Sequence, residues 1–326
     1  MSVETKDTPQ SLQLTDENKS VSPWVNNSYI KAATSDNTRI AYRGDIQHFE
    51  RWGGKLPATP VCIADYLQFY ASKLNSRTLA RRLTALRHWH NLQGFADPTQ
   101  HPAIQKTMTG ITRIHGKPKE KAHPLMPEDL LIIVNYLHSE NSFASMRDNA
   151  LLQLGFFGAF RRSELVNIQV EHLDWKEQGI DIQLPHSKTD QTNTGQFSAV
   201  PYGKDLLCPV TALKEWLNIS KIKQGAIFRE IKKGEILKEK CLTPLSVNYI
   251  LKKRAEQSGL SFSAKLSGHS LRRGLATSAS LAGASVSAIM RQGRWKGVNT
   301  VMEYVEASER FSDNVGLQIL ENIKFK

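Results

Sequence analysis

Residues 269–304 read HSLRRGLATSASLAGASVSAIMRQGRWKGVNTVMEY, and this stretch carries most of the chemistry that the sequence reveals. It contains a histidine and an arginine three residues apart, then an indole and a phenol: His269, Arg272, Trp295 and Tyr304. More than a hundred residues upstream lies the segment RRSEL, residues 161–165. Together these are the groups that in-line attack of a tyrosine hydroxyl on a DNA phosphodiester requires.

Cleavage of a phosphodiester without a metal needs positive charge on the non-bridging oxygens and an activated nucleophile. Arg161 and Arg272 suit the first task, because a guanidinium fork binds two phosphate oxygens and stays charged. Tyr304 is the candidate nucleophile. A phenol has a pKa of ~10, so it needs those cations nearby to attack as a phenolate.

Three further side chains fit the remaining roles. His269 would take or share the proton of the nucleophile, and Lys188, after an expected strand, would protonate the leaving 5′ oxygen. Trp295 would donate its indole N–H to the phosphate. Each residue also has a structural explanation: core packing for Tyr304 and Trp295, and a solvated hairpin for Lys188. Their order and spacing together favour the chemical interpretation.

The charge of the chain indicates an acidic partner. The 326 residues have a formal net charge of +12 and a pI near 9.5. Residues 26–123 contain 15 Lys and Arg against 6 Asp and Glu, so most of the excess lies in less than a third of the chain. Such a basic module would bind a polyanion by neutralising phosphates and releasing counterions. A solvated basic surface is the alternative.

Several classes of protein are disfavoured by composition. No apolar run approaches the ~20 residues of a membrane helix, and residues 1–24 predict a disordered polar tail rather than a secretory signal. The three cysteines, Cys62, Cys208 and Cys241, lack metal-ligand spacing and indicate thiols in a reducing cytoplasm. Without a Gly-rich phosphate loop or a cluster of metal ligands, we expect no cofactor and no metal.

Residues 25–115 are expected to form a small helical unit. Capping residues precede apolar positions at helical spacing near Ser35, Thr59, Asn75 and Pro102, which predicts four helices. Opposite its apolar stripe the third helix carries four arginines: Arg77, Arg81, Arg82 and Arg87. An arginine-rich helix face fits the major groove of DNA. A solvated helix face is again the alternative.

The rest of the chain predicts a linker and a mixed unit. Residues 116–124 are basic and broken by Gly and Pro, which is typical of a linker. In residues 125–326 we expect a helix from Pro127, another over 148–157, three short strands over 171–175, 179–184 and 196–201, a helix from Pro209, and helices again from Leu245. The predicted fold class is therefore mainly α with a small antiparallel β-sheet (α+β).

Over residues of about 25–320 the chain resembles the tyrosine recombinases, the phage integrase family. The Arg-x-Ser-Glu-Leu box of the family falls on residues 161–165, so Arg161 rather than Arg162 matches the clamp residue. Glu164 then occupies the acidic position that braces the site. The lysine of the family's mobile hairpin falls on Lys188.

The second half of the family signature lies in the opening stretch. The His-x-x-Arg box falls on His269 and Arg272, which makes Arg273 a bystander. Most members have a second histidine nine residues before the nucleophile, where this chain has Trp295. The indole keeps a hydrogen-bond donor at this place but cannot act as a general base.

The resemblance implies a helical, SAM-like core-binding domain and a catalytic domain, which clamp duplex DNA at a specific, inverted-repeat site. Tyr304 would form a 3′-phosphotyrosine and release a 5′-hydroxyl. Two exchanges through a Holliday junction would recombine two sites inside a tetramer, without ATP or metal. Amphipathic residues of about 311–323 would dock on the neighbouring protomer or pack in cis. Accessory DNA-bending proteins and a cytoplasmic, nucleoid-associated location in a prokaryote are also implied.

Two other interpretations fit the same residues: a different outcome of tyrosine cleavage, or DNA binding without cleavage. Type IB topoisomerases and telomere resolvases also cleave DNA with a tyrosine, and a decayed recombinase scaffold would bind DNA without cutting it. The compact size and the helical N-terminal unit favour recombination between two sites. The intact set of candidate residues argues against a decayed scaffold.

Overall fold

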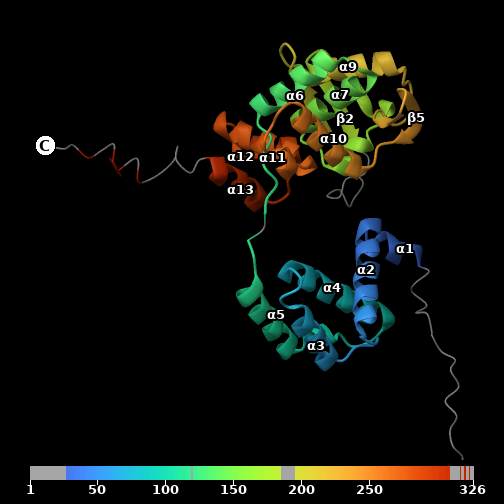
Figure 1. Ribbon diagram of the computed structural model, residues 1–326, viewed down its shortest axis with the longest axis vertical. Helices are drawn as coiled ribbons and strands as arrows, with labels where there is room; N and C mark the ends of the chain where they lie inside the picture. The colour runs from blue at the N-terminus through green and yellow to red at the C-terminus, as the bar shows by residue number, and fades with distance from the viewer. Residues whose placement is uncertain are drawn as a thin grey trace, which may run out of the picture. The chain divides into compact units, whose positions relative to one another are not determined.

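The computed structural model describes residues 27–118, 120–184 and 195–308, together with residues 316, 319, 320 and 323. The chain forms two compact units that divide between Glu120 and Lys121, inside the segment expected to be a linker (Figure 1). The predicted tail, residues 1–24, lies outside the described residues. No helix in the described part of the chain is long and apolar enough to span a membrane.

The first unit consists of helices whose ends follow the capping residues. They are α1 (Ser28–Ala32), α2 (Asp36–Trp52), α3 (Pro60–Tyr70), α4 (Ser76–Gln93), the short 3-10 helix η2 (Pro98–Gln100) and α5 (Pro102–His115). Side chains of Ser35, Thr59 and Asn75 accept backbone hydrogen bonds at the starts of α2, α3 and α4. The prediction of a helical N-terminal unit is confirmed, whereas α1 and the short η2 were not expected.

The apolar faces of these helices meet in one core. Phe49 of α2, Leu67 of α3, Leu86 of α4 and Ile104 of α5 are all completely or almost completely buried there. Their spacing along each helix is the i, i+3/i+4 pattern that places apolar side chains on one face. Packing of these faces, rather than helix propensity, therefore holds the short helices together.

The four arginines of α4 do not share one exposed face. Arg82 is buried, and its guanidinium donates to the Tyr66 hydroxyl at 2.9 Å and lies 3.5 Å from the carboxylate of Asp45. The prediction that Arg82 lies opposite the apolar stripe is wrong. Position 82 is three residues after Leu79, and residues three apart lie on the same side of a helix. Arg82 therefore serves the interior of this unit.

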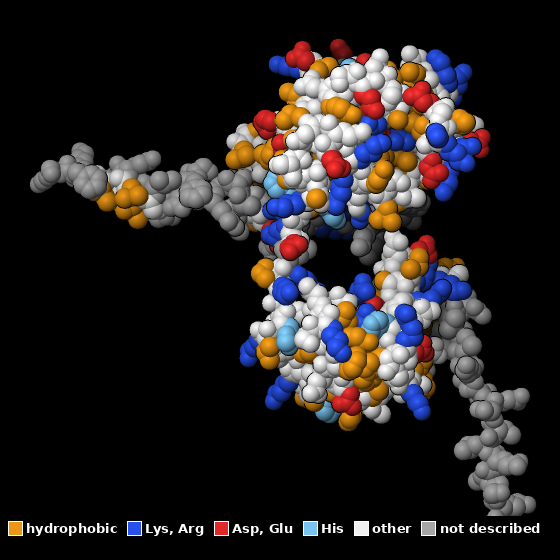
Figure 2. All heavy atoms as spheres, viewed as in Figure 1, with side chains coloured by type: hydrophobic (Ala, Val, Ile, Leu, Met, Phe, Trp, Pro, Cys, Tyr) orange, Lys and Arg blue, Asp and Glu red, His pale blue; other side chains and the backbone are white. Residues whose placement is uncertain are grey.

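The other three arginines of α4 remain partly exposed. Arg81 binds Asp45 through two hydrogen bonds of 2.9 and 2.8 Å, yet 53% of its side chain is exposed. Arg87 lies 3.1 Å from Asp97, and Arg77 donates to two carbonyls in the segment after α5. Lysine and arginine side chains are spread over the visible face of this unit (Figure 2). These three arginines keep some donors accessible to a partner.

The second unit is mixed, as expected. Its helices are α6 (Pro127–Glu140), α7 (Phe143–Phe157), α8 (Arg162–Val166), α9 (Pro209–Ser220), α10 (Pro244–Gln257), α11 (Gly268–Leu281), α12 (Val286–Gly293) and α13 (Val298–Ser308), with 3-10 helices η3 (Val170–His172) and η4 (Ser263–Lys265). Strands β1 (Leu173–Lys176), β2 (Gly179–Leu184) and β3 (Gln196–Pro201) form one antiparallel sheet. The predicted fold class, mainly α with a small antiparallel sheet, is confirmed.

A second hairpin, β4 (Arg229–Lys232) and β5 (Ile236–Cys241), was not expected. Its sequences, REIK and ILKEKC, mix charged and apolar residues, and none of its residues is fully buried. Strands with two largely solvent-exposed faces lack the alternation of apolar and polar residues by which a strand is recognised in a sequence. The hairpin lies at the edge of the unit (Figure 1).

Helix α7 lies between two apolar clusters and organises this unit. Leu151 and Leu154 pack with β2 and α9, whereas Leu152 and Phe156 pack with α6, α10 and α11. Because α7 is buried on more than one side, its apolar positions do not form a single stripe. Because α8 and α11 both pack on α7, this helix brings the two halves of the family signature together.

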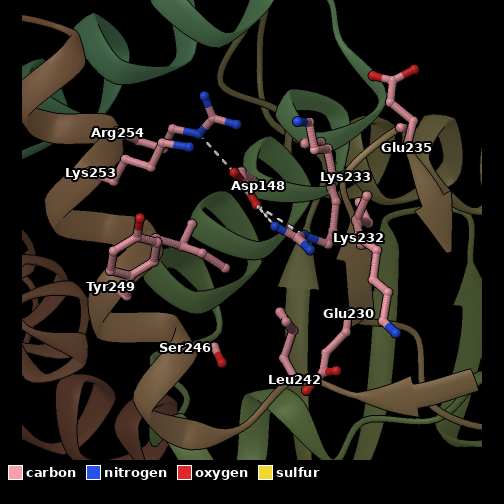
Figure 3. Close-up of a pocket in the computed structure, with 15 residues that line it drawn as sticks. Asp148, Glu230, Lys232, Lys233, Glu235, Leu242, Ser246, Tyr249, Lys253 and Arg254 are labelled. Atoms are coloured by element: carbon pink, nitrogen blue, oxygen red, sulfur yellow. Dashed lines mark hydrogen bonds and ion pairs between the residues drawn. The ribbon is translucent and has the colours of Figure 1, made fainter. Parts of the chain in front are cut away.

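A buried ion cluster ties α7 to α10 (Figure 3). The Asp148 carboxylate accepts from Arg254 Nε at 2.7 Å and from Arg147 Nη2 at 2.7 Å, and all three side chains are almost completely buried. Arg254 also pairs with Glu140 at 2.6 Å. A pocket lined by α7, α10 and the β4–β5 hairpin opens over this cluster, and it contains none of the candidate site residues.

We expect Asp148→Asn to lower the free energy of unfolding by about 3 kcal/mol or more, because two buried guanidinium groups lose their common counter-charge. Urea denaturation followed by circular dichroism measures the effect. The control is Asp174→Asn, which removes a carboxylate from an exposed pair with Lys176. Equal losses for the two variants would contradict a stabilising role for the buried cluster.

Candidate active site

Tyr304 lies on the face of α13 that packs against α11 and α12. Its neighbours Val301 and Val305 are buried with Ala276 of α11 and Ile289 of α12, and the partly buried ring of Tyr304 packs against this cluster. The apolar positions one turn before and next to the tyrosine therefore determine which way the phenol faces. Packing holds the helix, and the phenol stays accessible at its edge.

Trp295 connects Tyr304 to Arg272. The rings of Trp295 and Tyr304 meet edge to face with their centroids 5.8 Å apart. On the other side, Arg272 Cζ lies 4.4 Å from the centroid of the Trp295 ring. This arrangement requires Gly293, because a Cβ atom there would lie 1.7 Å from Cζ3 of Trp295. Trp295 thus contacts two of the other predicted site residues, one on each side.

Arg272 is buried at the start of α11 and is held by main-chain carbonyls. Its guanidinium donates to the carbonyl of Ala159 and, at 2.6 Å, to the carbonyl of Gly293. Burial, together with the charge of Arg161, lowers the pKa of Arg272 to about 9, whereas Glu164 and Tyr304 act in the opposite direction. The two arginines, the carboxylate and the phenol therefore share one electrostatic environment. A phosphate is the ligand that would relieve the repulsion between the two cations.

Arg161 stands directly before α8 and is braced by Glu164. The side chains form an ion pair, and the Arg161 backbone N–H donates to the second carboxylate oxygen at 2.9 Å. Glu164 is 3% exposed, whereas 21% of the Arg161 side chain is exposed. The guanidinium thus reaches from a buried carboxylate towards the surface. Glu164 lies where the sequence places the bracing carboxylate.

The Glu164 carboxylate is ionised at neutral pH despite its burial. Burial alone would raise its pKa, but the hydrogen bond from the Arg161 backbone and the charges of Arg294 and Arg161 outweigh it. The pKa of Glu164 is therefore lower than that of a free glutamate. A group with a lowered pKa stabilises the fold above its unfolded pKa, and this contribution disappears as the pH falls through the folded pKa.

We therefore expect Glu164→Gln to destabilise the protein at neutral pH, with a deficit that shrinks as the pH falls below ~4.3, the pKa of an unfolded glutamate. The measurement is the free energy of unfolding of wild type and variant at several pH values from 6 towards 3. Glu177→Gln, at an exposed position in the β1–β2 turn, is the control. A deficit that does not change with pH would argue against an ionised, braced Glu164.

Three further residues from the signature have different surroundings. His269 is exposed in the first turn of α11, where its backbone N–H donates to Ser267 Oγ at 3.3 Å. Arg273, expected to be a bystander, lies with Cζ 5.7 Å from the centroid of the Tyr304 ring and donates to the Ala122 carbonyl at 3.0 Å. Lys188 lies outside the described residues, as do most of residues 311–323.

Arg294 is part of this site and was not singled out in the sequence. Its guanidinium is buried and lies 3.2 Å from the Glu164 carboxylate, the group that also binds Arg161. Arginines are rarely buried. Neither the neighbouring residues Gly293 and Trp295 nor the position of Arg294 in the sequence predicts that its side chain faces inward. Only the tertiary structure places this cation beside Glu164.

Metal ligands do not gather in the described part of the chain. No group of three or more His, Cys, Asp or Glu side chains there could hold a metal ion. Cys208 instead caps α9, because its Sγ accepts a hydrogen bond from the backbone of Thr211. Burial would raise the pKa of the Cys208 thiol. Hydrogen bonds from the side chain and backbone of Thr211 and from the backbone of Gly203 and Val210 outweigh burial, so the pKa is lowered.

Comparison with known proteins identifies the family of this chain. Residues 125–310 match the model of the phage integrase family, and residues 24–92 match that of the phage integrase N-terminal SAM-like domain. An integrase/recombinase XerD homolog of Selenomonas ruminantium is 37% identical over 294 residues, which cover 87% of this chain and 86% of that protein. The recombinase Cre of Escherichia phage P1 is 24% identical over 268 residues, 76% of each chain.

Solved structures share the fold. The crystal structure of a lambda integrase dimer bound to a COC′ core site superposes with a TM-score of 0.59 at 17% identity, covering 88% of this chain and 77% of that one. The chain belongs to the phage integrase family, and it is a tyrosine-type site-specific DNA recombinase.

Proposed function

We propose that the protein cuts and rejoins duplex DNA through a covalent bond between Tyr304 Oη and a 3′-phosphate. The observation that carries this proposal is the contact chain from Tyr304 through Trp295 to the buried guanidinium of Arg272. A phenol beside fixed cations is activated where charge develops on the phosphate, and such preorganised charge is a major source of rate enhancement.

The proposed reaction is balanced without an outside reagent. Tyr304 Oη attacks the phosphorus while Arg161 and Arg272 bind the non-bridging oxygens, and the P–O5′ bond breaks. His269 receives or shares the phenol proton, and Lys188 protonates the 5′ oxygen. A 5′-hydroxyl from a second duplex then attacks the phosphotyrosine and releases Tyr304. Because one phosphodiester replaces another, no ATP or metal enters the reaction.

The proposed partner is duplex DNA with a specific, inverted-repeat site. The excess of basic residues in the first unit and the accessible donors of Arg77, Arg81 and Arg87 support this role. We place the reaction in a tetramer on two sites, with a Holliday-junction intermediate, and at the nucleoid in the cytoplasm. Residues 311–323, which would link neighbouring protomers, and accessory DNA-bending proteins complete this proposal.

Covalent capture on DNA tests the proposed function. Purified protein is incubated with fragmented genomic DNA of its host, denatured, and the protein-linked fragments are sequenced, with and without a chelator. We expect adducts that resist chelation and converge on a short palindromic site. Sequence-specific binding without any adduct would instead indicate a silent scaffold. Adducts without sequence preference, together with relaxation of supercoils, would indicate a topoisomerase.

A further inference from the structure

Arg294 has an unusual backbone and an unusual burial at the same position. It ends α12 with φ at 55°, in the left-handed region that glycine usually occupies at a helix end. Its side chain is only 5% exposed. A backbone outlier that also buries a charge persists only where the surrounding structure holds it in place, and such outliers gather at functional sites.

The guanidinium of Arg294 joins three separate segments of the second unit. It donates at 3.2 Å to the carbonyls of Gly158 and Ala159, at 2.8 Å to Ser198 Oγ of β3, and at 3.2 Å to Glu164. It also lies 4.9 Å from the centroid of the Phe160 ring. The turn after α7, the start of α8 and strand β3 therefore share one buried cation.

The same turn holds Arg272. The Ala159 carbonyl accepts from both Arg272 and Arg294, and Ala159 itself has φ at 46°. The second carbonyl that holds Arg272 belongs to Gly293, the residue directly before Arg294. Arg294 therefore holds both acceptors of the Arg272 guanidinium. It donates a hydrogen bond to the Ala159 carbonyl, and it is joined to Gly293 by a peptide bond.

We propose that Arg294 is a positioning residue that holds Arg161 and Arg272 in register on the scissile phosphate, through Glu164 and the Ala159 carbonyl respectively. This inference rests on the proposed function, in which those two arginines bind the non-bridging oxygens. Arg294 itself would not bind the phosphate, because its side chain is buried and its terminal nitrogens donate to the turn after α7, to Ser198 and to Glu164.

A guanidinium suits this task where an ammonium does not. Its planar fork presents donors in fixed directions, so one side chain reaches the Gly158 and Ala159 carbonyls, Ser198 and Glu164 at once. Its charge also compensates the buried Glu164 carboxylate, whose pKa it helps to lower. Lysine would keep the charge near Glu164 but lose the hold on the Ala159 carbonyl.

Arg294→Gly tests the inference, because glycine accepts the positive φ and removes only the side chain. We expect the rate of covalent cleavage of a nicked suicide duplex carrying the captured site to fall about 10²-fold, the effect of misplaced catalytic groups. The affinity for the same duplex, measured by gel shift, should stay unchanged. Arg294→Lys should be similarly slow, and Arg291→Ala, at an exposed position of α12, should cleave like wild type.

A second substrate separates positioning of the clamp from an effect on the leaving group. A duplex with a 5′-bridging phosphorothiolate at the scissile position releases a thiol, whose pKa of ~8.5 makes protonation unnecessary. Because Arg294 is inferred to act through Arg161 and Arg272, its variants should remain slow on this substrate. Recovery to the wild-type rate would show that Arg294 acts on the proton donor, and it would overturn the inference.

The outcomes also separate this inference from the proposed function. If wild type forms no adduct with either duplex, the proposed function fails. If wild type forms adducts and a folded Arg294→Gly or Arg294→Lys cleaves as fast, the inference alone fails. Thermal unfolding of each variant identifies any loss of fold, and Arg294→Lys keeps the test valid should Arg294→Gly not fold.

Discussion

Tyr304→Phe should form no detectable covalent adduct with DNA and should bind its site as wild type does. The substitution removes only the hydroxyl, while the ring contacts with Trp295 and Arg273 remain. Loss of a catalytic nucleophile costs roughly 10⁴-fold or more in rate, which places the variant below detection in a denaturing gel. Gel shift on the same duplex measures binding independently.

The matched control for this prediction is Tyr249→Phe. Tyr249 is the tyrosine of helix α10, and its side chain is exposed. It carries the same hydroxyl, but it lines the pocket over Asp148 rather than lying beside Trp295 and Arg272. It should keep full cleavage. Adduct formation that survives Tyr304→Phe and disappears in Tyr249→Phe would show that the nucleophile lies on α10 and not on α13.

Arg272→Lys should slow covalent cleavage by about 10²–10³-fold, although the positive charge is kept. An ammonium cannot reproduce the guanidinium fork that donates to the Ala159 and Gly293 carbonyls and stacks on Trp295. The charge would then lie at a different distance from the phosphate. Single-turnover cleavage of the suicide duplex measures the rate, and gel shift separates it from binding.

Arg291→Lys is the control for Arg272→Lys, since it makes the same exchange at an exposed position in the same unit. Equal rates for wild type and Arg272→Lys would mean that charge alone suffices at position 272. In that case the hydrogen bonds to the two carbonyls would serve the fold rather than the reaction.

The two arginines of the site differ in how they are held. Arg161 is braced by a carboxylate and reaches the surface, whereas Arg272 is buried and held by carbonyls. The Glu164 carboxylate forms an ion pair with Arg161, whereas the carbonyls orient Arg272 without neutralising it. Burial and the charge of Arg161 lower the pKa of Arg272, and a bound phosphate would raise it again.

Much of the fold follows from local patterns in the sequence. The starts of α2, α3 and α4 coincide with their capping residues, and β2 and β3 have the bounds that alternation and turn residues indicate. These features depend on residues within one turn or one strand, so they can be identified without long-range information. The β4–β5 hairpin was not predicted because its sequence shows no clear alternation of apolar and polar residues.

The error at Arg82 has a related cause. The charge suggested an outward side chain, but the spacing from Leu79 placed Arg82 on the buried face, where the Tyr66 hydroxyl accepts its hydrogen bond and Asp45 forms an ion pair with it. A buried cation needs partners from other helices. Those partners cannot be identified from α4 alone, and so composition favoured the wrong face for this one arginine.

By itself the sequence determined the class of chemistry, the nucleophile candidate and the division into a basic helical unit and a mixed unit. Residue types and their order along the chain carry that information. Only the tertiary structure decided which cations face inward: it buried Arg82 and Arg294, and it placed Arg294 between Glu164 and the Ala159 carbonyl. The reason is physical, because the environment of a charged side chain depends on partners distant in sequence that only folding brings within hydrogen-bonding distance.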